Sequence, residues 1–548
     1  MARTPLLRAV QRLYQDFTEA ERSERPIEEV QEERRARWTR RDFVKAGGAA
    51  LGAVALGGTV PALAGKAFAG QPRIAIVGGG IAGLNAALTL SDAGYTSTVY
   101  EASSRVGGRM HSDTTSWANG QVSEHCGELI DSGHKVIQQL AKRFGFGLTD
   151  LLSAQPNQST DTFYFLGGYY PNAQANSDFK PVYNQVHSDA SAAGYPTLYN
   201  SSTARGRQLD QMSLYDYIET YVAGGHASPM GRLLDVAYNT EYGNETTVQS
   251  SLNLIYLLAY QPQPGQFRIF GASDERYHVT GGNEQVPRAM AAYLQANGSS
   301  VNLDTSLTGI VLNRDGSYTL SFSSGNQKSS AVADRVVLAL PFSVLRTILS
   351  SGSSYTRAGF DGLKQTAIQQ LGYGTNSKLH MQFSGRLWNQ TGPWGISTGY
   401  SFSDLAYQNS WDVSRGQGGS TGILVNYTGG NQGASLSNPS MLATYTQNAL
   451  QDLEKVFPGI SATFNGISTL DYPLGNPYLL GSYSYWKVGQ YTQFSGFERA
   501  RQPYPNGRCH FAGEHCSINF QGYMEGGAQE GARAANEILD DYKAGIFP

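Results

Sequence analysis

The stretch Ile74-Ala75-Ile76-Val77-Gly78-Gly79-Gly80-Ile81-Ala82-Gly83 decides the fold of this chain. Its first four residues form a continuous apolar run of strand length, of the kind that is buried in a parallel sheet. The glycine turn is followed by residues 84–90, which have helical spacing, and a second strand is expected over 96–100, just before Glu101. The order strand, glycine turn, helix, strand and acid predicts a dinucleotide-binding unit.

Each residue type in this unit has a physical role. Gly78 permits the tight turn, Gly80 lets the backbone approach a pyrophosphate, and Gly83 lets the helix pack on the strand. The N-terminus of the helix offers free N–H groups and partial positive charge to the phosphates. Glu101 is placed to accept hydrogen bonds from a ribose diol. The expected cofactor contacts here are Gly78, Gly80, Ile81, Ala82, Gly83, Glu101 and Ala102.

A second glycine motif, Arg105-Val106-Gly107-Gly108-Arg109, follows soon after Glu101. The combined pattern resembles two-domain flavoproteins, in which the second glycine pair approaches the diphosphate and the flavin. It therefore favours FAD over NAD as the cofactor. Further FAD contacts are expected from Arg105, Gly108, Arg109, Met110, Gly127, Glu128 and Leu129.

The C-terminal part of the chain carries the same kind of signal. Residues 509–513 predict a short strand that ends in glycine, and Glu514 follows it. Gly522-Tyr523-Met524 then leads into a helix through residue 538. A helix N-terminus beside a flavin ring would stabilise negative charge on the ring. Gly513, Glu514, Gly522, Tyr523 and Met524 are therefore candidate FAD contacts.

Three blocks together resemble the flavin amine oxidase family: the N-terminal fingerprint, residues 281–287 (Gly-Gly-Asn-Glu-Gln-Val-Pro) and the C-terminal block. That family includes monoamine, polyamine and L-amino acid oxidases, and exported bacterial L-amino acid oxidases are the most similar in appearance. The resemblance covers residues from about 72 to 540. It implies that Glu514 holds the ribityl chain and that Val311 lies on a strand whose backbone contacts adenine.

The resemblance also implies a fold of class α/β plus α+β, with a Rossmann-like FAD-binding domain built from discontinuous segments and an inserted substrate-binding domain. We expect the FAD-binding domain to comprise 71–135, 271–344 and 481–548, and the substrate-binding domain to comprise 136–270 and 345–480.

Three residues are expected to do chemistry. Lys378 matches the position at which family members hold a lysine hydrogen-bonded through water to the flavin N5 atom. Tyr483 and Tyr523 match the segments that supply two facing aromatic rings, which can steer an amine and favour an adjacent cation. Trp486 is expected to form a wall beside the flavin. Some family members attach FAD through a cysteine, but Ser482 stands at that position here, so we predict non-covalent FAD.

The sequence leaves the substrate open. An L-amino acid requires a cation for its carboxylate, and Arg268 and Arg276 are the candidates. A polyamine requires acids along a tunnel, for which Glu128 and Asp131 are placed, and the same acids would suit a basic amino acid. We favour oxidative deamination of an L-amino acid, basic or broad in range, to a 2-oxo acid, ammonia and hydrogen peroxide. Amine or polyamine oxidation is the main alternative, and a quinone-linked dehydrogenase is another.

Other classes of protein are conceivable for such a flavoprotein. Related two-domain flavoproteins act as isomerases or desaturases, and a flavin-binding scaffold is also conceivable; Lys378 with Tyr483 and Tyr523 argues for amine chemistry. The partners we expect are a small amine or amino acid and molecular oxygen, with assembly into a homo-oligomer. The net charge of −3, without a basic stripe, argues against nucleic acid, and the spacing of the three cysteines argues against a metal site.

The first seventy residues are expected to be an export segment. Thr39-Arg40-Arg41-Asp42-Phe43-Val44-Lys45 is followed by a weakly apolar run, Ala46 to Leu63, and by small-x-small sites. This pattern resembles a twin-arginine signal, which carries folded proteins across a membrane. We therefore expect a periplasmic or extracellular protein, which would meet a membrane only through an uncleaved signal.

Overall fold

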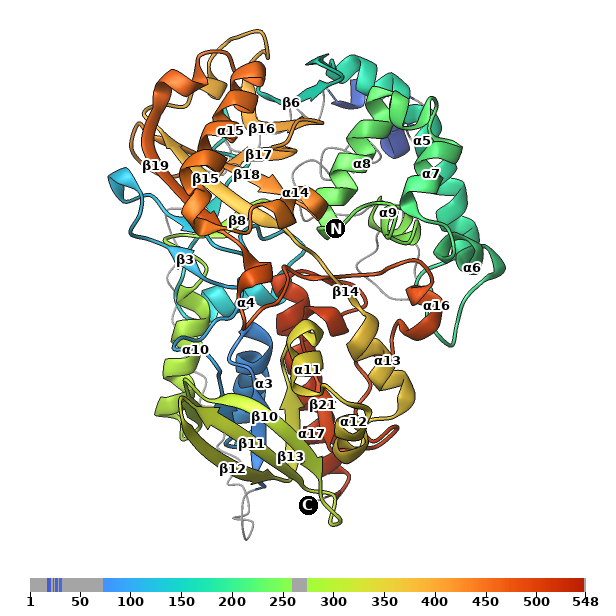
Figure 1. Cartoon of the computed structure of the whole chain (residues 1–548), viewed down its shortest axis with the longest axis vertical. Coiled ribbons are helices and arrows are strands. Elements are labelled where there is room, and N and C mark those ends of the chain that lie inside the picture. Colours follow the sequence, from blue (N-terminus) through green and yellow to red (C-terminus); the bar gives the residue numbers. More distant parts are fainter. Residues whose placement is uncertain are drawn as a thin grey trace, which may run out of the picture.

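The computed structural model describes residues 17–20, 23, 25–27, 29–31, 72–258 and 274–546. Within these residues the chain builds one body around a five-stranded sheet and another around a seven-stranded sheet, at the bottom and the top of Figure 1. The architecture is a mixture of α/β and α+β structure, as the sequence predicts.

The five-stranded sheet is parallel and has the order β21-β13-β1-β2-β9. Its strands are β1 (Ile74–Val77), β2 (Thr98–Tyr100), β9 (Ser300–Asn302), β13 (Arg335–Leu338) and β21 (Cys509–Phe511). Residues that are far apart in the sequence are thus direct neighbours: Ile74 lies opposite Arg335, and Val336 lies opposite Cys509. Every strand of this sheet comes from a segment that we assigned to the FAD-binding domain.

Side chains of β1 alternate between two hydrophobic cores because a strand repeats every two residues. Ile74 and Ile76 pack into a core that is shared with several helices, whereas Ala75 and Val77 pack on the opposite face. With both faces covered, every position must be apolar, which explains the unbroken apolar run. The helices of this core include α3 (Ile81–Asp92), α10 (Gln285–Ala296) and α17 (Met524–Lys543).

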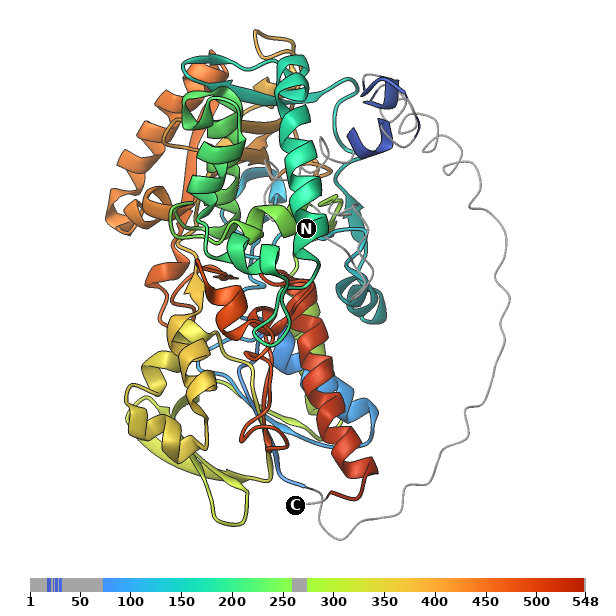
Figure 2. The same ribbon diagram turned by 90° about the vertical axis from the view of Figure 1, so that its right-hand side faces the viewer.

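Helices α3 and α17 lie side by side, as Figure 2 shows in blue and red. Glycine makes this close approach possible. A Cβ atom on Gly531 would lie 2.1 Å from the carbonyl oxygen of Ala82, closer than real Cβ atoms come. The N-terminal fingerprint and the C-terminal block are therefore packed against each other through these two helices.

The opposite face of the five-stranded sheet is covered by a three-stranded antiparallel sheet and three helices. The sheet consists of β10 (Ser306–Leu312), β11 (Tyr318–Ser324) and β12 (Gln327–Ala333), and the helices are α11 (Phe342–Ile348), α12 (Gly352–Ala358) and α13 (Gly362–Gln370). Residues 345–371 thus pack with β1 and β13, and α4 (Lys135–Arg143) packs with α3 and α17. The boundaries of packing therefore differ from the domain boundaries expected at 135/136 and 344/345. Apolar spacing in a sequence shows that a helix buries one face, but it does not show which sheet that face packs against.

The seven-stranded sheet has the order β19-β15-β18-β17-β16-β6-β7. Its strands are β6 (Thr160–Phe165), β7 (Gly168–Tyr169), β15 (Ser377–Phe383), β16 (Ser397–Ser403), β17 (Asn409–Asp412), β18 (Gly422–Thr428) and β19 (Phe464–Asp471). Leu379, Met381 and Phe383 of β15 pack with α15 (Leu442–Val456). The alternation therefore directs Lys378 to the other face of the sheet.

A group of helices completes the upper body. The group comprises α5 (Asn172–Ala193), α6 (Ala204–Asp210), α7 (Leu214–Tyr221), α8 (Pro229–Tyr242) and α9 (Leu252–Leu258). The side chains of Thr203, Ser213 and Ser228 accept hydrogen bonds from amides in the first turns of α6, α7 and α8. Buried residues of these helices share one core with Phe402 and Val425 of the seven-stranded sheet.

Two short ladders join the upper and lower bodies. One pairs β14 (Gly372–Tyr373) with β20 (Ser484–Tyr485), and the other pairs β5 (Leu148–Asp150) with β8 (Tyr277–Val279). The first ladder fixes the chain on either side of Tyr483, since Gly374 N donates to the carbonyl of Tyr483 at 2.8 Å.

Most of the expected export segment, including Arg40 and Arg41, lies outside the described residues. Among the described residues of this segment, Phe17 is 8 % exposed, and its ring centroid lies 5.8 Å from that of Tyr183 on α5. Among the helices that the structure describes, none combines the length and the apolar character required to cross a membrane.

Candidate active site

A cavity of about 450 Å³ lies between the two bodies. One side of it is formed where parallel strands end: Gly78 follows β1, Pro341 follows β13 and Gly513 follows β21. The other side carries Lys378 of β15 and Tyr427 of β18. Ligands of open α/β sheets bind beyond the carboxyl ends of the strands, so the cavity is where a dinucleotide would be expected.

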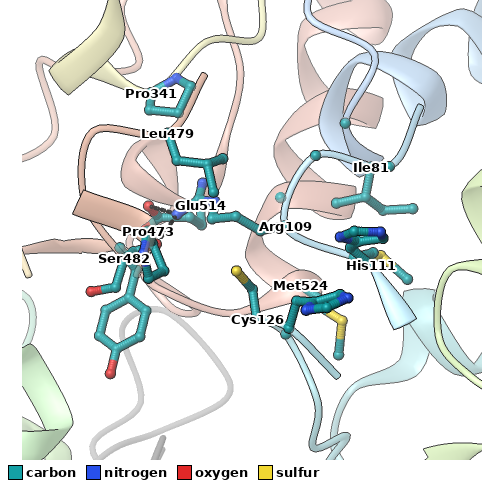
Figure 3. A pocket seen from close by; sticks show the side chains of 18 of the residues that line it. Ile81, Arg109, His111, Cys126, Pro341, Pro473, Leu479, Ser482, Glu514 and Met524 are labelled. Carbon is teal, nitrogen blue, oxygen red and sulfur yellow. Dashed lines mark hydrogen bonds and ion pairs between the residues drawn. The ribbon is translucent and has the colours of Figure 1, made fainter. Parts of the chain in front are cut away.

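The structure brings most of the candidate site residues to this cavity, although they are spread over more than four hundred positions of sequence. Figure 3 shows Ile81, His111 and Met524 on one side of it and Pro473, Leu479 and Ser482 on the other. The candidate residues that line the cavity are Gly78, Gly80, Ile81, Ala82, Glu101, Ala102, Arg105, Gly108, Arg109, Met110, Gly127, Glu128, Leu129, Lys378, Tyr483, Gly513, Glu514, Gly522, Tyr523 and Met524.

The glycine turn has the close contacts that its residue types require. Gly78 has φ +107°, and a Cβ atom there would lie 2.6 Å from the carbonyl oxygen of Ala339. A Cβ atom on Gly83 would lie only 1.9 Å from the carbonyl oxygen of Gly78, so the helix packs on the turn as predicted. Gly83 does not line the cavity itself, and its contribution is this packing.

Glu101 is buried and holds the turn in shape. Its carboxylate accepts hydrogen bonds from Gly79 N at 2.7 Å and from Ser103 N at 2.8 Å. A carboxylate has about four lone-pair sites, so it retains capacity for a diol in the cavity that it lines.

Two helix N-termini meet the cavity without side-chain caps. The N-cap residues are Gly80 for α3 and Tyr523 for α17, and neither makes a side-chain hydrogen bond to the first turn. Uncapped first-turn amides are a ready site for an anion. Together with the close approach of the Gly80 and Gly108 backbones, these features fit a diphosphate and a flavin ring. The residues present therefore suit FAD.

Arg109 and the buried Glu514 form an ion pair in the cavity wall. Arg109 Nη1 donates to Glu514 Oε1 at 2.9 Å and to the carbonyl of Ser482 at 2.9 Å, as Figure 3 shows. Glu514 also accepts from Ser484 Oγ and from Gly522 N, each at 2.7 Å. Burial alone would raise the pKa of Glu514, but Arg109 and these donors lower it to about 2. The pair ties the second glycine motif to the C-terminal block.

Lys378 is held by a carboxylate. Its Nζ atom donates to Glu128 Oε2 at 2.7 Å and to the carbonyl of Glu124 at 3.0 Å. Trp411 Nε1 donates to the other carboxylate oxygen of Glu128 at 2.9 Å. All three side chains are buried and line the cavity.

The two candidate tyrosines line the same cavity from different elements. The hydroxyl groups of Tyr483 and Tyr427 lie 2.6 Å apart, and Tyr483 also donates to the carbonyl of Thr240. The ring of Tyr523 contacts the ring of His134, with centroids 5.2 Å apart. Burial lowers the pKa of His134 to about 4, so Tyr523 packs against a neutral imidazole.

The family can now be established. Residues 81–539 match the family described as flavin-containing amine oxidoreductase. The chain belongs to this family. It is an FAD-dependent oxidoreductase that acts on amines or amino acids, and FAD is its cofactor.

Relatives of this amine oxidoreductase include enzymes for both substrate classes. It is 26 % identical over 492 residues to an L-amino-acid oxidase of Siganus canaliculatus, covering 85 % of each chain. It is 25 % identical over 479 residues to polyamine oxidase 7 of Oryza sativa subsp. japonica, covering 83 % of this chain and 92 % of that one. The fold is similar to that of cyclohexylamine oxidase from Brevibacterium oxydans IH-35A, with a TM-score of 0.69 at 21 % identity, covering 86 % of this chain and all of that one.

Two expected cofactor contacts of the amine oxidoreductase are not part of the described cavity lining. Val311 lies on β10 with 38 % of its surface exposed, and its backbone contact with adenine stays a prediction. Trp486 packs with Tyr491 and Phe494 and borders a smaller cavity that also includes Tyr523. It is therefore not a wall of the main cavity.

The arginines proposed for a substrate carboxylate do not line the cavity in the described part of the chain. Arg276 donates to Asp150 Oδ2 at 2.8 Å and does not contribute to the lining. Arg268 lies outside the described residues. Asp131 lines the cavity, and it accepts from the backbone amide of Glu275 at 2.7 Å.

Sequence reasoning missed a histidine pair in the cavity lining. The rings of His111 and His125 lie 4.1 Å apart, and His125 Nδ1 lies 2.6 Å from Asp471 Oδ1. Burial, together with the neighbouring His125, lowers the pKa of His111 to about 4. Burial would lower the pKa of His125 as well, but Asp471 raises it. No spacing signal could have revealed the contact between His125 and Asp471, because these residues are 346 positions apart.

Proposed function

We propose that this amine oxidoreductase is an oxidase of L-amino acids with a basic side chain. The reaction converts the amino acid, oxygen and water into a 2-oxo acid, ammonia and hydrogen peroxide. FAD, when bound, accepts a hydride from the α-carbon. The similarity to the L-amino-acid oxidase of Siganus canaliculatus supports the reaction class.

The charge of the cavity carries the proposal of a basic substrate. We set aside the histidines and the charged residues assigned to FAD, which are Glu101, Arg105, Arg109 and Glu514. The rest of the described lining then has three carboxylates, Glu128, Asp131 and Glu275, and one cation, Lys378. Asp131 and Glu275 are 1 % and 2 % exposed. Carboxylates that line a binding cavity are suitable ion-pair partners for a cationic group of the substrate. The cationic side chain of a basic amino acid carries such a group.

The remaining residues bind and orient the substrate. Tyr483 and Tyr523 present rings that favour a neutral amine next to a developing cation. Oxidation of a polyamine is the second candidate, because the same acids would bind a second amino group and because polyamine oxidase 7 of rice is a relative.

Peroxide release on a panel of substrates tests the proposal. The purified enzyme is mixed with each of the twenty L-amino acids, with D-lysine, and with putrescine and spermidine. We expect the strongest signal from L-lysine and L-arginine and none from D-lysine. Glu275→Gln serves as a charge control: it should raise the KM for basic amino acids about tenfold and change that for neutral ones little.

Each other pattern has a definite meaning. A signal from polyamines alone would contradict the amino acid proposal in favour of a polyamine oxidase. Reduction of the flavin by amino acids without peroxide would indicate a quinone-linked dehydrogenase. Absence of peroxide with all amino acids and polyamines, together with no reduction of an artificial electron acceptor, would contradict amine chemistry altogether.

A further inference from the structure

Glu128 and Lys378 form an ion pair that is shielded from bulk solvent. The distance between Lys378 Nζ and Glu128 Oε2 is 2.7 Å, and the two residues are 5 % and 8 % exposed. A lysine in such surroundings loses its proton readily unless an anion stands beside it, because burial disfavours the charged form. Within the described part of the chain, Glu128 is the carboxylate that contacts Lys378.

Glu128 is itself held in place. Trp411 Nε1 donates to Oε1 at 2.9 Å while Lys378 uses Oε2, so both carboxylate oxygens have a donor. Lys378 Nζ also lies 5.6 Å from the centroid of the Trp411 ring. Trp411 is on β17 and Lys378 is on β15, and both strands pair with β18, so the two donors are fixed by one sheet.

We propose that Glu128 is a positioning residue that keeps Lys378 protonated and fixes its ammonium group at the cavity surface. The inference rests on the proposed oxidase function. A fixed positive charge at the cavity surface stabilises negative charge that develops nearby, as happens when oxygen takes up two electrons and two protons to become hydrogen peroxide. The electrons for this step come from the flavin that the amine substrate has reduced.

The behaviour of the carboxylate agrees with an ion pair. Burial would raise the pKa of Glu128, but Lys378 and the hydrogen bonds from Lys378 and Trp411 lower it overall. Since the carboxylate is ionised at neutral pH, it favours the charged form of the lysine beside it.

The other titratable groups around Lys378 come from several elements. His380 lies on β15, and Asp471 lies on β19 opposite Lys378. His125 and Cys126 follow Glu124, whose carbonyl accepts from Lys378, and His278 of β8 interacts with Glu128. Burial lowers the pKa of His380 well below its usual value, and burial raises that of Cys126 to about 11, so both are neutral near neutral pH. Among these groups, Glu128 is the carboxylate in direct contact with Lys378.

The test compares Glu128→Gln with the wild type as holoenzymes. The flavin is reduced by light, without any substrate, and its reoxidation by oxygen is followed by stopped flow as a function of pH. The reoxidation rate is expected to fall at alkaline pH, and we call this fall the alkaline limb of the profile. Loss of the adjacent anion should move this limb to lower pH by about one unit or more. It should also slow reoxidation near neutral pH about tenfold. Glu128→Asp keeps the charge and should return the limb towards its wild-type position.

A second measurement does not depend on turnover. Acetic anhydride labels only the neutral amine, so the pH dependence of Lys378 labelling, read by peptide mass spectrometry, reports its protonation. The midpoint should be lower in Glu128→Gln than in the wild type. Trp411→Phe should lower it by a smaller amount, since it removes one donor to Glu128 but leaves the charge.

Controls and contrary outcomes are distinct. Glu530→Gln removes another buried carboxylate, which pairs with Arg533 outside the cavity, and should leave both the limb and the labelling midpoint unchanged. An unchanged limb and midpoint in a folded, FAD-loaded Glu128→Gln protein would overturn the proposal. If that variant does not fold, an unchanged midpoint in Trp411→Phe overturns it. A wild-type enzyme whose reduced flavin does not react with oxygen would instead contradict the oxidase function.

Discussion

Lys378→Met slows the flavin half-reactions on the order of a hundredfold while FAD stays bound. The reason is the placement of the ammonium group, which lies in the cavity lining with Glu128 and Trp411 but makes no contact with the Arg109–Glu514 pair or the glycine turns. Methionine has a similar volume and no charge. The measurement is stopped-flow spectroscopy of flavin reduction by the substrate and of reoxidation by oxygen, with the flavin content of the variant as the check on binding.

A second buried lysine provides the matched control. Lys364 is also fully buried, but it donates to the carbonyls of Phe497 and Glu498 away from the cavity. Lys364→Met should lower the melting temperature and leave the flavin kinetics near those of the wild type. Near-normal rates of both half-reactions in Lys378→Met would remove Lys378 from the chemistry.

Glu514→Ala should weaken FAD binding about a hundredfold. Loss of one partner from a buried ion pair costs about 3 kcal/mol, because Arg109 is left as an uncompensated charge. A loss of this size from the free energy of FAD binding raises the Kd about a hundredfold. Equilibrium titration of the FAD-free protein with FAD, followed by flavin fluorescence, measures the change.

The pH dependence of this contribution has a definite sign. The pKa of Glu514 is lowered to about 2 in the folded protein, below its ordinary value of 4.5. Its ionisation therefore stabilises the fold above about pH 4.5, and this stability is lost as the pH falls towards 2. Glu537 also has a pKa of about 2, since His510 and Arg533 outweigh its burial, but it does not line the cavity. Glu537→Ala should lose acid stability and keep its affinity for FAD, whereas an unchanged Kd in Glu514→Ala would contradict the assignment.

The dinucleotide half of the site could be predicted from the sequence because its signals are local. Gly83 and Glu101 act on atoms within about one strand-turn-helix unit, and the contacts of Gly83 with the carbonyl of Gly78 and of Glu101 with Gly79 N are set by that spacing. The parallel sheet follows from the apolar runs in β1 and in residues 336–338 of β13, which require cover on both faces.

The substrate half could not be predicted in the same way because its contacts are long-range. Trp411 meets Glu128 across 283 positions, and His125 meets Asp471 across 346. A periodic pattern of residues along the chain gives no information about contacts over such sequence distances.

The flavin content of the purified protein tests the central claim most directly, namely that distant segments converge around one FAD. The protein is denatured with acid, the precipitate is removed, and FAD in the filtrate is measured against the amount of chain. The convergence of both glycine motifs, Glu514 and the N-terminus of α17 on one cavity, with Ser482 in place of a linking cysteine, predicts one FAD per chain, released into the filtrate. A colourless protein that takes up no FAD would contradict the account, and flavin retained on the precipitate would contradict non-covalent binding.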